Sequence, residues 1–196
     1  MGRLVLLTGL PGVGKSSLVS KLLEIARKRK IPIIYTTYGT LMLELAVEKG
    51  LVSNRDEIRK LPLPIQKDLQ AMASKRIRDM RKEDGLVIVD THMIISTERG
   101  WLPGISVNNL EDIRPDQIIL VEAEPEAIYG RRRRDKTRMR DEESLESIEE
   151  ELLFSRYVAA ACSVLTGSPV KIVVNREGKL DEAAYEILGV LEAMAK

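Results

Sequence analysis

Short apolar runs alternate along this chain with longer stretches in which apolar residues recur every three or four positions. The runs, rich in Val, Ile and Leu, cover residues 4–7, 31–36, 86–89, 118–121 and 170–174. Continuous apolar runs of this length are typical of buried parallel strands. The helical period marks residues 15–29, 41–49, 65–82, 125–134, 144–165 and 181–194. This alternation predicts an α/β fold, with a parallel sheet between two layers of helices.

Glycines stand where three of these helices are expected to end, at Gly50, Gly85 and Gly167. Glycine is favoured there because it readily takes the left-handed conformation that closes a helix. No internal repeat or flexible linker interrupts the pattern, so we expect a single domain over residues 1–196. In sheets of this kind ligands bind beyond the carboxyl ends of the strands, so the residues that follow each run are the first candidates for a site.

Composition narrows the classes of partner. The 196 residues include 31 Lys and Arg against 30 Asp and Glu, and this balance gives no overall field that would favour nucleic acid or a membrane surface. No apolar stretch approaches the roughly twenty residues of a membrane span, and no signal peptide precedes the first run. We therefore expect a cytoplasmic protein with a small-molecule partner. The single cysteine, Cys162, cannot form an internal disulfide and has the apolar neighbours of a buried helix position.

The first apolar run leads into the most informative motif. Residues 9–16 read Gly-Leu-Pro-Gly-Val-Gly-Lys-Ser, a complete phosphate-binding loop. Its glycines let backbone N–H groups wrap a β-phosphate at the positive end of the following helix. Lys15 can reach the β- and γ-phosphates, and the Ser16 hydroxyl can hold Mg²⁺. The motif predicts binding of a nucleoside triphosphate.

An acid and the chain's single histidine follow the third run, in the sequence Asp90-Thr91-His92. In phosphate-loop proteins a carboxylate at this place usually reaches Mg²⁺ directly or through water. Capping of a strand end is the alternative for Asp90. For His92 three interpretations stay open: a structural hydrogen bond, a place in the wall of an acceptor site, or a general base.

A basic segment follows the fourth run and its helix. Residues 131–141 read Arg-Arg-Arg-Arg-Asp-Lys-Thr-Arg-Met-Arg-Asp, in which seven of eleven residues are basic. Guanidinium groups that converge on a phosphoryl group in flight stabilise its charge, and a closing segment expels water. Consecutive arginines point in different directions around a helix, so we assign this role to Arg131, Arg138 and Arg140 and expect Arg132 and Arg133 at the surface. A solvated basic face is the alternative.

A third group of polar residues lies between the second and third runs, where a two-substrate enzyme of this type binds its phosphate acceptor. Tyr38-Gly39-Thr40 closes the second run and opens a helix, and Arg59 and Gln66 follow. Arg59 could neutralise an acceptor phosphate, and an ion pair with Asp56 is the alternative. The amide of Gln66 could read a base edge, or could simply face solvent.

Together these motifs make the chain resemble the archaeal type of adenylate kinase. The resemblance rests on residues 9–16, 38–40, 55–61, 90–92, 100–104, 131–141 and 173–178, and so covers nearly the whole chain. The phosphate loop alone is shared by many unrelated enzymes. Its combination with Asp90-Thr91-His92 and with Thr137-Arg138-Met139-Arg140-Asp141 is far more specific.

The resemblance implies Mg²⁺-dependent transfer of the terminal phosphoryl group of ATP to AMP, giving two ADP. It also implies a five-stranded parallel core, a small acceptor-binding helical insert over residues 38–82, a short lid around 131–141 and a homotrimer. The residues that it assigns are as follows: for ATP, Gly9, Leu10, Pro11, Gly12, Val13, Gly14, Lys15, Ser16, Ser17 and Asn175; for AMP, Tyr38, Gly39, Thr40, Arg59, Gln66 and His92; for the metal, Ser16 and Asp90; for catalysis, Lys15, Arg131, Arg138 and Arg140.

Three other functions are alternatives for a chain with this phosphate loop. Another nucleotide or small-molecule kinase would differ mainly within residues 38–70. A regulatory GTPase needs an Asn/Thr-Lys-x-Asp tetrapeptide, which Asn175-Arg176-Glu177-Gly178 does not supply. An RNA-binding or assembly ATPase could use the basic residues 131–140, but aromatic residues for base stacking are not interleaved with them.

Overall fold

The computed structural model describes residues 2–58, 60–81, 85–97, 100–134 and 144–194. Its strands are β1 (Arg3–Gly9), β2 (Ile33–Thr37), β3 (Leu86–Asp90), β4 (Ile94–Thr97), β5 (Gly100–Pro103), β6 (Gln117–Glu122) and β7 (Val170–Val174). Its helices are α1 (Lys15–Lys28), α2 (Tyr38–Glu48), α3 (Arg55–Ile58), α4 (Leu63–Met80), α5 (Val107–Ile113), α6 (Pro125–Arg134), α7 (Leu145–Thr166) and α8 (Leu180–Met194).

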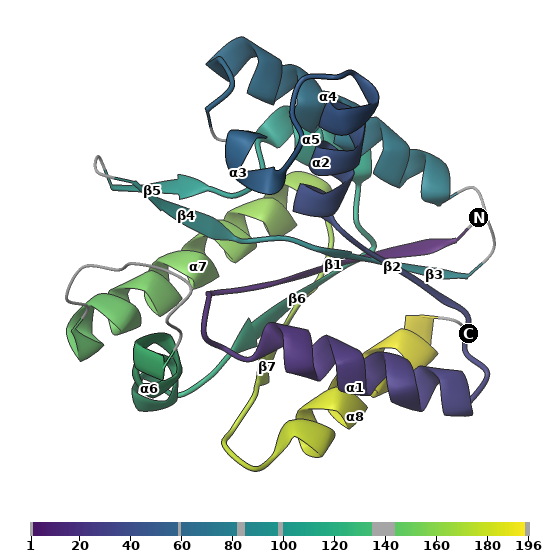
Figure 1. Cartoon of the computed structure of the whole chain (residues 1–196). Coiled ribbons are helices and arrows are strands. Elements are labelled where there is room, and N and C mark those ends of the chain that lie inside the picture. The colour runs from purple at the N-terminus through teal and green to yellow at the C-terminus, as the bar shows by residue number, and fades with distance from the viewer. Residues whose placement is uncertain (1, 59, 82–84, 98–99, 135–143, 195–196) are drawn as a thin grey trace.

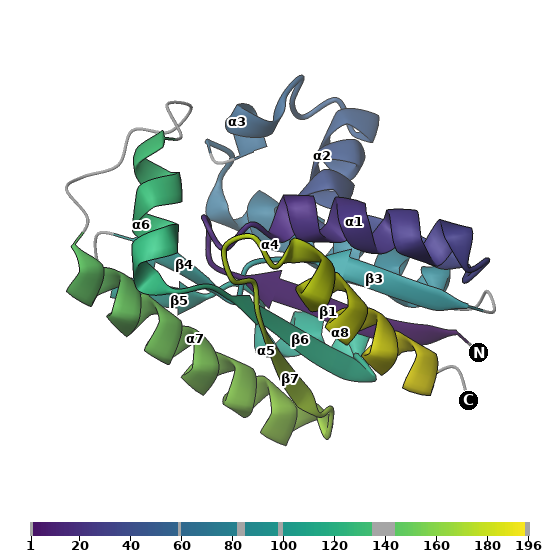
Figure 2. The ribbon, with the colours of Figure 1, turned by 90° about the horizontal axis from the view of Figure 1, so that it is seen from below.

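Five strands form one parallel sheet in the order β2-β3-β1-β6-β7. Helices cover both of its faces, with α1 and α8 side by side on one face and α2, α4, α5 and α7 on the other (Figures 1 and 2). The predicted three-layer α/β/α fold with a five-stranded parallel sheet is confirmed. All five predicted strands are present, with ends that differ by up to two residues from the apolar runs.

The core lies where the apolar runs meet the helices. Leu4, Val5, Leu6 and Leu7 of β1 are fully buried, since the central strand is covered on both faces. The register places Leu7 of β1 and Thr37 of β2 both beside Asp90 of β3. The carboxyl ends of three strands therefore meet at one edge of the sheet.

Local signals explain where the helices begin. The Thr37 side chain caps α2 by accepting a hydrogen bond from the N–H of Thr40 at 2.9 Å. Ser144 and Ser147 form a reciprocal capping box at the start of α7, and Gly167 closes that helix at φ 73°. The predicted helix ends at Gly50 and Gly167 are confirmed, because both glycines take positive φ, Gly167 directly after α7 and Gly50 two residues after Glu48, the last residue of α2. The predicted end at Gly85 is wrong, because α4 ends at Met80 with Arg81 as its C-cap.

Sequence periodicity did not predict four short elements. These are the helices α3 and α5 and the antiparallel hairpin β4–β5. The hairpin packs on α7 through Trp101 and Phe154, whose ring centres lie 5.1 Å apart. In the part of the chain that the structure describes, no helix has the length and apolar character needed to cross a bilayer.

Candidate functional site

A pocket of about 610 Å³ lies at the carboxyl ends of β1, β2 and β3. The loop after β1, the start of α2, the end of β3 and helix α6 all contribute to its wall. The predicted site residues that line it are Leu10, Pro11, Gly12, Gly14, Lys15, Ser16, Ser17, Tyr38, Gly39, Asp90, His92 and Arg131. The structure thus brings the phosphate loop, the Asp90 turn and the first residues of α2 into one cavity.

Lys15 and Asp90 form an ion pair inside this pocket. Lys15 Nζ lies 2.5 Å from Asp90 Oδ1 and donates to the Thr91 carbonyl at 2.9 Å. Tyr35 donates to the other carboxylate oxygen of Asp90 at 3.0 Å. Burial, followed by the charge of Asp90, raises the pKa of the Tyr35 phenol, which therefore stays a hydrogen-bond donor at neutral pH. Asp90 is held from two sides, with its carboxylate at the pocket wall.

Atoms of β6 and Asn175 pack closely against the phosphate loop, and its glycines leave room for them because they have no Cβ. A Cβ on Gly9 would lie 2.4 Å from the Val121 carbonyl oxygen of β6. Gly14 has φ 82°, and a Cβ there would lie 2.5 Å from Asn175 Nδ2. Asn175 is buried and donates to the Val13 carbonyl at 2.8 Å, so it contacts the loop rather than the cavity. The described lining of the cavity does not include Gly9, Val13 or Asn175. These residues therefore hold the loop from behind and do not face the cavity.

Helix α6 places two arginines against the same loop. Arg131 donates to the Gly12 carbonyl at 3.2 Å and to Glu177 at 2.7 Å, and it lines the pocket. Its hydrogen bond and charge lower the pKa of the exposed Glu177 carboxyl. Arg133 is exposed, as predicted, and lies over the Tyr129 ring. The prediction that Arg132 lies at the surface is wrong: it is buried, because it follows the buried Ile128 by one helical turn.

The other half of the pocket differs in detail from the sequence prediction. Gln66 donates its amide to the Leu61 carbonyl at 2.7 Å, and neither Gln66 nor Thr40 is among the described lining residues. Arg55 and Gln70 line the pocket in their place, together with Met42. Arg55 packs against Gly39, where a Cβ would meet its guanidinium at 2.2 Å. Arg59, Arg138 and Arg140 lie outside the described residues.

Sequence signals for these additional residues existed but were weak. Arg55 stands in the same short segment as Arg59, and Gln70 follows Gln66 by one helical turn. Tyr38, which was assigned to the acceptor, donates its hydroxyl to the Gln70 carbonyl at 2.7 Å and pairs with Ser74 at 2.9 Å. Burial raises the pKa of Tyr38 to about 12. Its hydroxyl therefore positions α4 against α2 at the pocket wall.

Two solved shikimate kinases share this architecture. Shikimate kinase from Acinetobacter baumannii, solved in complex with shikimate, superposes with a TM-score of 0.61 at 14% identity, over 98% of this chain and 94% of that chain. The shikimate kinase from Bacteroides thetaiotaomicron gives 0.58 at 14% identity, over 97% and 98%. A family described as an AAA domain matches residues 8–149. The fold and the phosphate loop thus define the class: a P-loop α/β protein with the fold of small kinases.

Sequence relatives identify the member of this class. An adenylate kinase of Methanocaldococcus jannaschii is 45% identical over 190 residues, 97% of this chain and 98% of that protein. Adenylate kinases of Sulfurisphaera tokodaii and Thermoplasma acidophilum are each 46% identical, over 93% and 94% of this chain and 96% of each relative. The chain belongs to the archaeal adenylate kinases, which confirms the resemblance read from its motifs.

Proposed function

We propose that this adenylate kinase binds ATP along the phosphate loop and AMP in the half of the pocket between β2 and α4, and transfers the terminal phosphoryl group between them. The observation that carries the proposal is the single cavity shared by Lys15, Asp90 and Arg55. One cavity that holds both nucleotides in line turns a bimolecular reaction into an effectively unimolecular one. The products are two ADP, and the reaction is reversible.

On the ATP side, Lys15 is the residue assigned to the phosphates. Its ammonium is held at the pocket wall by the Asp90 carboxylate and the Thr91 carbonyl, and so it is already in place when the nucleotide arrives. When ATP binds, its phosphate oxygens would replace the Asp90 carboxylate as the partner of Lys15, so the ammonium would have a counter-charge both before and after binding. Arg131 approaches the same loop from α6 and adds a second cation. Arg138 and Arg140 remain proposed contributors to the charge of the transferred group.

Mg²⁺ is the proposed cofactor. Ser16 and Asp90 both line the pocket and offer a hydroxyl and a carboxylate oxygen, the hard ligands that Mg²⁺ prefers, with room for phosphate and water oxygens beside them. These residues fit the ion. When bound with ATP, it would neutralise the β- and γ-phosphate oxygens.

On the AMP side, Arg55 lines the pocket against Gly39 at the start of α2, and Gln70 supplies an amide. A guanidinium matches a phosphate bidentately, and an amide offers both donors and an acceptor to a base edge. Arg59, Gly39 and the exposed His92 complete the proposed acceptor region within residues 38–82 and the Asp90 turn. Residues 131–141 are the proposed lid.

We further propose that the protein is a homotrimer located in the cytoplasm. Helix α7 leaves apolar side chains exposed on one face: Leu153, Tyr157 and Val164 are spaced by four and seven positions, and Val164 is 85% exposed. Exposed apolar patches on one helix face are typical of protein interfaces. Val164→Glu should shift the mass measured by light scattering from trimer to monomer, and a monomeric wild-type protein would contradict the proposal.

The deciding experiment for the reaction is an acceptor panel. Purified protein with Mg²⁺ and ATP is incubated with AMP, dAMP, CMP, UMP, GMP or no acceptor, and the products are separated by chromatography. We expect ADP formation that depends on AMP. Equal consumption of ATP with and without every acceptor would indicate an ATPase, and preference for a different acceptor would indicate another kinase of this fold.

A further inference from the structure

Three consecutive backbone carbonyls of the phosphate loop are held by three side chains from outside the loop. Arg132 Nε donates to the Pro11 carbonyl at 2.8 Å, Arg131 Nη1 to that of Gly12 at 3.2 Å, and Asn175 Nδ2 to that of Val13 at 2.8 Å. The two arginines belong to α6, and Asn175 follows β7. The loop is therefore held along its length by elements more than a hundred residues away in sequence.

These contacts fix the direction of the N–H groups that a phosphate needs. A trans peptide is planar, so its carbonyl and its N–H point to opposite sides. With the carbonyls of Pro11, Gly12 and Val13 turned toward α6 and Asn175, the N–H groups of Gly12, Val13 and Gly14 are turned away from these side chains. The Val13 N–H also donates to the Leu10 carbonyl at 3.4 Å, so the hydrogen bonds behind the loop matter chiefly for the orientation of the Gly12 and Gly14 N–H groups.

Arg132 is the charged member of this set that phosphate contact does not explain, since Asn175 is neutral and Arg131 lines the pocket. The Arg132 side chain is 4% exposed and is absent from the described lining of the pocket, whereas Arg131 lines it. Arg132 also donates to Glu151 of α7 at 2.7 Å, and Glu151 is itself 17% exposed. A buried guanidinium needs a counter-charge, and its rigid fork can serve a carboxylate and a carbonyl together. A Cβ on Gly12 would lie 3.1 Å from Arg132 Cγ, so loop and arginine are in direct contact.

We propose that Arg132 is a positioning residue for the ATP site. It holds the Pro11 carbonyl outward so that the Gly12 N–H is presented to a bound phosphate, and Glu151 holds Arg132 in that place. The proposal rests on the proposed binding of ATP along this loop. It predicts that a buried side chain outside the cavity controls affinity for the triphosphate without controlling affinity for AMP.

The test compares Arg132→Met, Arg132→Lys and the matched control Arg133→Met, whose arginine is exposed one position further along α6. Arg132→Met keeps an apolar stem of similar length and should lower kcat/KM for ATP about 10²-fold, the order expected when a catalytic constellation shifts by about an ångström. The KM for AMP at saturating ATP should change less than twofold. Arg132→Lys should recover part of the loss, because an ammonium cannot hold both partners in the same geometry. Arg133→Met should match the wild type.

The dissociation constant for ATP, measured by calorimetric titration, separates this proposal from the proposed reaction. Weaker ATP binding by Arg132→Met supports the positioning role even if the acceptor panel identifies an acceptor other than AMP. A lower unfolding temperature with ATP affinity and kcat within twofold of wild type would show that Arg132 is merely structural. If Arg132→Met does not fold, Glu151→Gln decides: a KM for ATP raised about threefold or more supports the proposal, and an unchanged one overturns it.

Discussion

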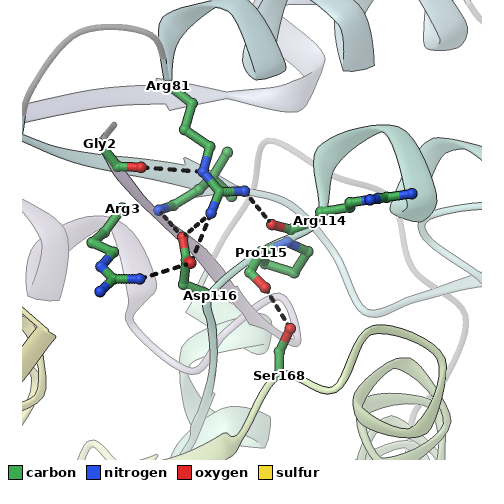
Figure 3. A network of polar contacts seen from close by, with 8 residues as sticks. Gly2, Arg3, Arg81, Arg114, Pro115, Asp116 and Ser168 are labelled. Atoms are coloured by element: carbon green, nitrogen blue, oxygen red, sulfur yellow. Dashed lines mark hydrogen bonds and ion pairs between the residues drawn. The ribbon is translucent and has the colours of Figure 1, made fainter.

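The two ends of the parallel sheet use the same kinds of charged side chain in opposite ways. At the carboxyl end Lys15, Asp90 and Arg55 border a cavity. At the amino end Arg81 donates to both carboxylate oxygens of Asp116 at 2.7 Å and to the carbonyls of Gly2 and Arg114 (Figure 3). Asp116 also accepts from the N–H of Leu4 at 2.8 Å and from Arg3. Charges are paired within the protein at both ends, but only at the carboxyl end do the paired groups, Lys15 and Asp90, line a cavity.

The difference follows from what surrounds each group. Asp116 directly precedes β6, and its partners include Leu4 of β1 and Arg81, which follows α4. Its contacts therefore join the starts of β1 and β6 to the end of α4 and stabilise the fold. Ser168 adds a hydrogen bond to the Pro115 carbonyl at 2.5 Å (Figure 3). Asp90 stands at the opposite end of its strand, beside a space of about 610 Å³. Substitutions at the two ends should therefore separate activity from stability.

Removal of the cation at the carboxyl end should give the largest effect. Lys15→Ala is expected to lower kcat by about 10³-fold, the upper range for loss of one preorganised donor to a developing charge. Asp90 keeps its hydrogen bond from Tyr35 and faces the open pocket, so the loss of stability should be smaller than that of Arg81→Ala. Steady-state kinetics and thermal unfolding of the same preparation measure both. A kcat within tenfold of wild type would contradict the assignment of Lys15.

Removal of the cation at the amino end should do the reverse. Arg81→Ala breaks a charge-assisted network between side chains that are 15% and 18% exposed, and should cost about 2–3 kcal/mol of unfolding free energy. For a chain of this size that lowers the unfolding temperature by about 5–10 °C. The kcat at 25 °C should stay within twofold. Arg3→Ala serves as the control, because its ion pair is longer and more exposed and should change stability by less than about 1 kcal/mol.

Substitutions in the acceptor half of the pocket should separate effects on the KM for AMP from effects on the KM for ATP. Arg55→Ala should raise the KM for AMP about tenfold with a smaller change in kcat, because it meets a phosphate that is already charged in the ground state. Arg59→Ala tests the original assignment in the same assay. Arg76→Ala is the matched control, since Arg76 pairs with Glu48 at the surface of α4. A raised KM for ATP with an unchanged KM for AMP in Arg55→Ala would reverse the assignment of the two halves.

Substitution of Tyr38 should have the smallest effect on activity and stability at neutral pH. Tyr38 lines the pocket, but like Arg81 it makes its hydrogen bonds within the protein, to the Gln70 carbonyl and Ser74. Burial raises its pKa to about 12, so the folded chain keeps a proton that the unfolded chain releases near pH 10. Its contribution to stability is full below pH 10 and is lost as pH rises toward 12, at about 1.4 kcal/mol per pH unit. Tyr38→Phe should flatten that slope in denaturant titrations at pH 9–11. An unchanged slope would contradict this account.

The sequence predicted the parts of the fold that rest on local patterns. Buried parallel strands are apolar along their whole length, so all five strands of the main sheet could be recognised. The hairpin β4–β5 could not, because its four-residue strands include Ser96 and Thr97 and are stabilised by the contact of Trp101 with Phe154. Such a contact depends on where α7 packs, which no local pattern encodes.

The site residues, too, could be predicted from the sequence only where a local pattern identifies them. The phosphate loop is contiguous, so its residues could be named, and Asp90 followed from its place after a strand. The roles of the four consecutive arginines depend on which face of α6 packs against the core. Arg132 follows the buried Ile128 by four positions, and this spacing was the available signal that it points inward. The packing of α4 on α2 distinguished Gln70 from Gln66, and the structure places Arg55 at the pocket, whereas Arg59 lies outside the described residues.

The contacts behind the phosphate loop also bear on protein design. A designer who copies residues 9–16 onto another strand and helix would transfer the glycines but leave behind Arg131, Arg132 and Asn175, the donors that occupy three of the loop's carbonyls. Those carbonyls would then need water or new partners, and the flexible Gly12 and Gly14 would be free to adopt other conformations. The smallest unit that can be transplanted is therefore the loop together with α6 and the turn after β7.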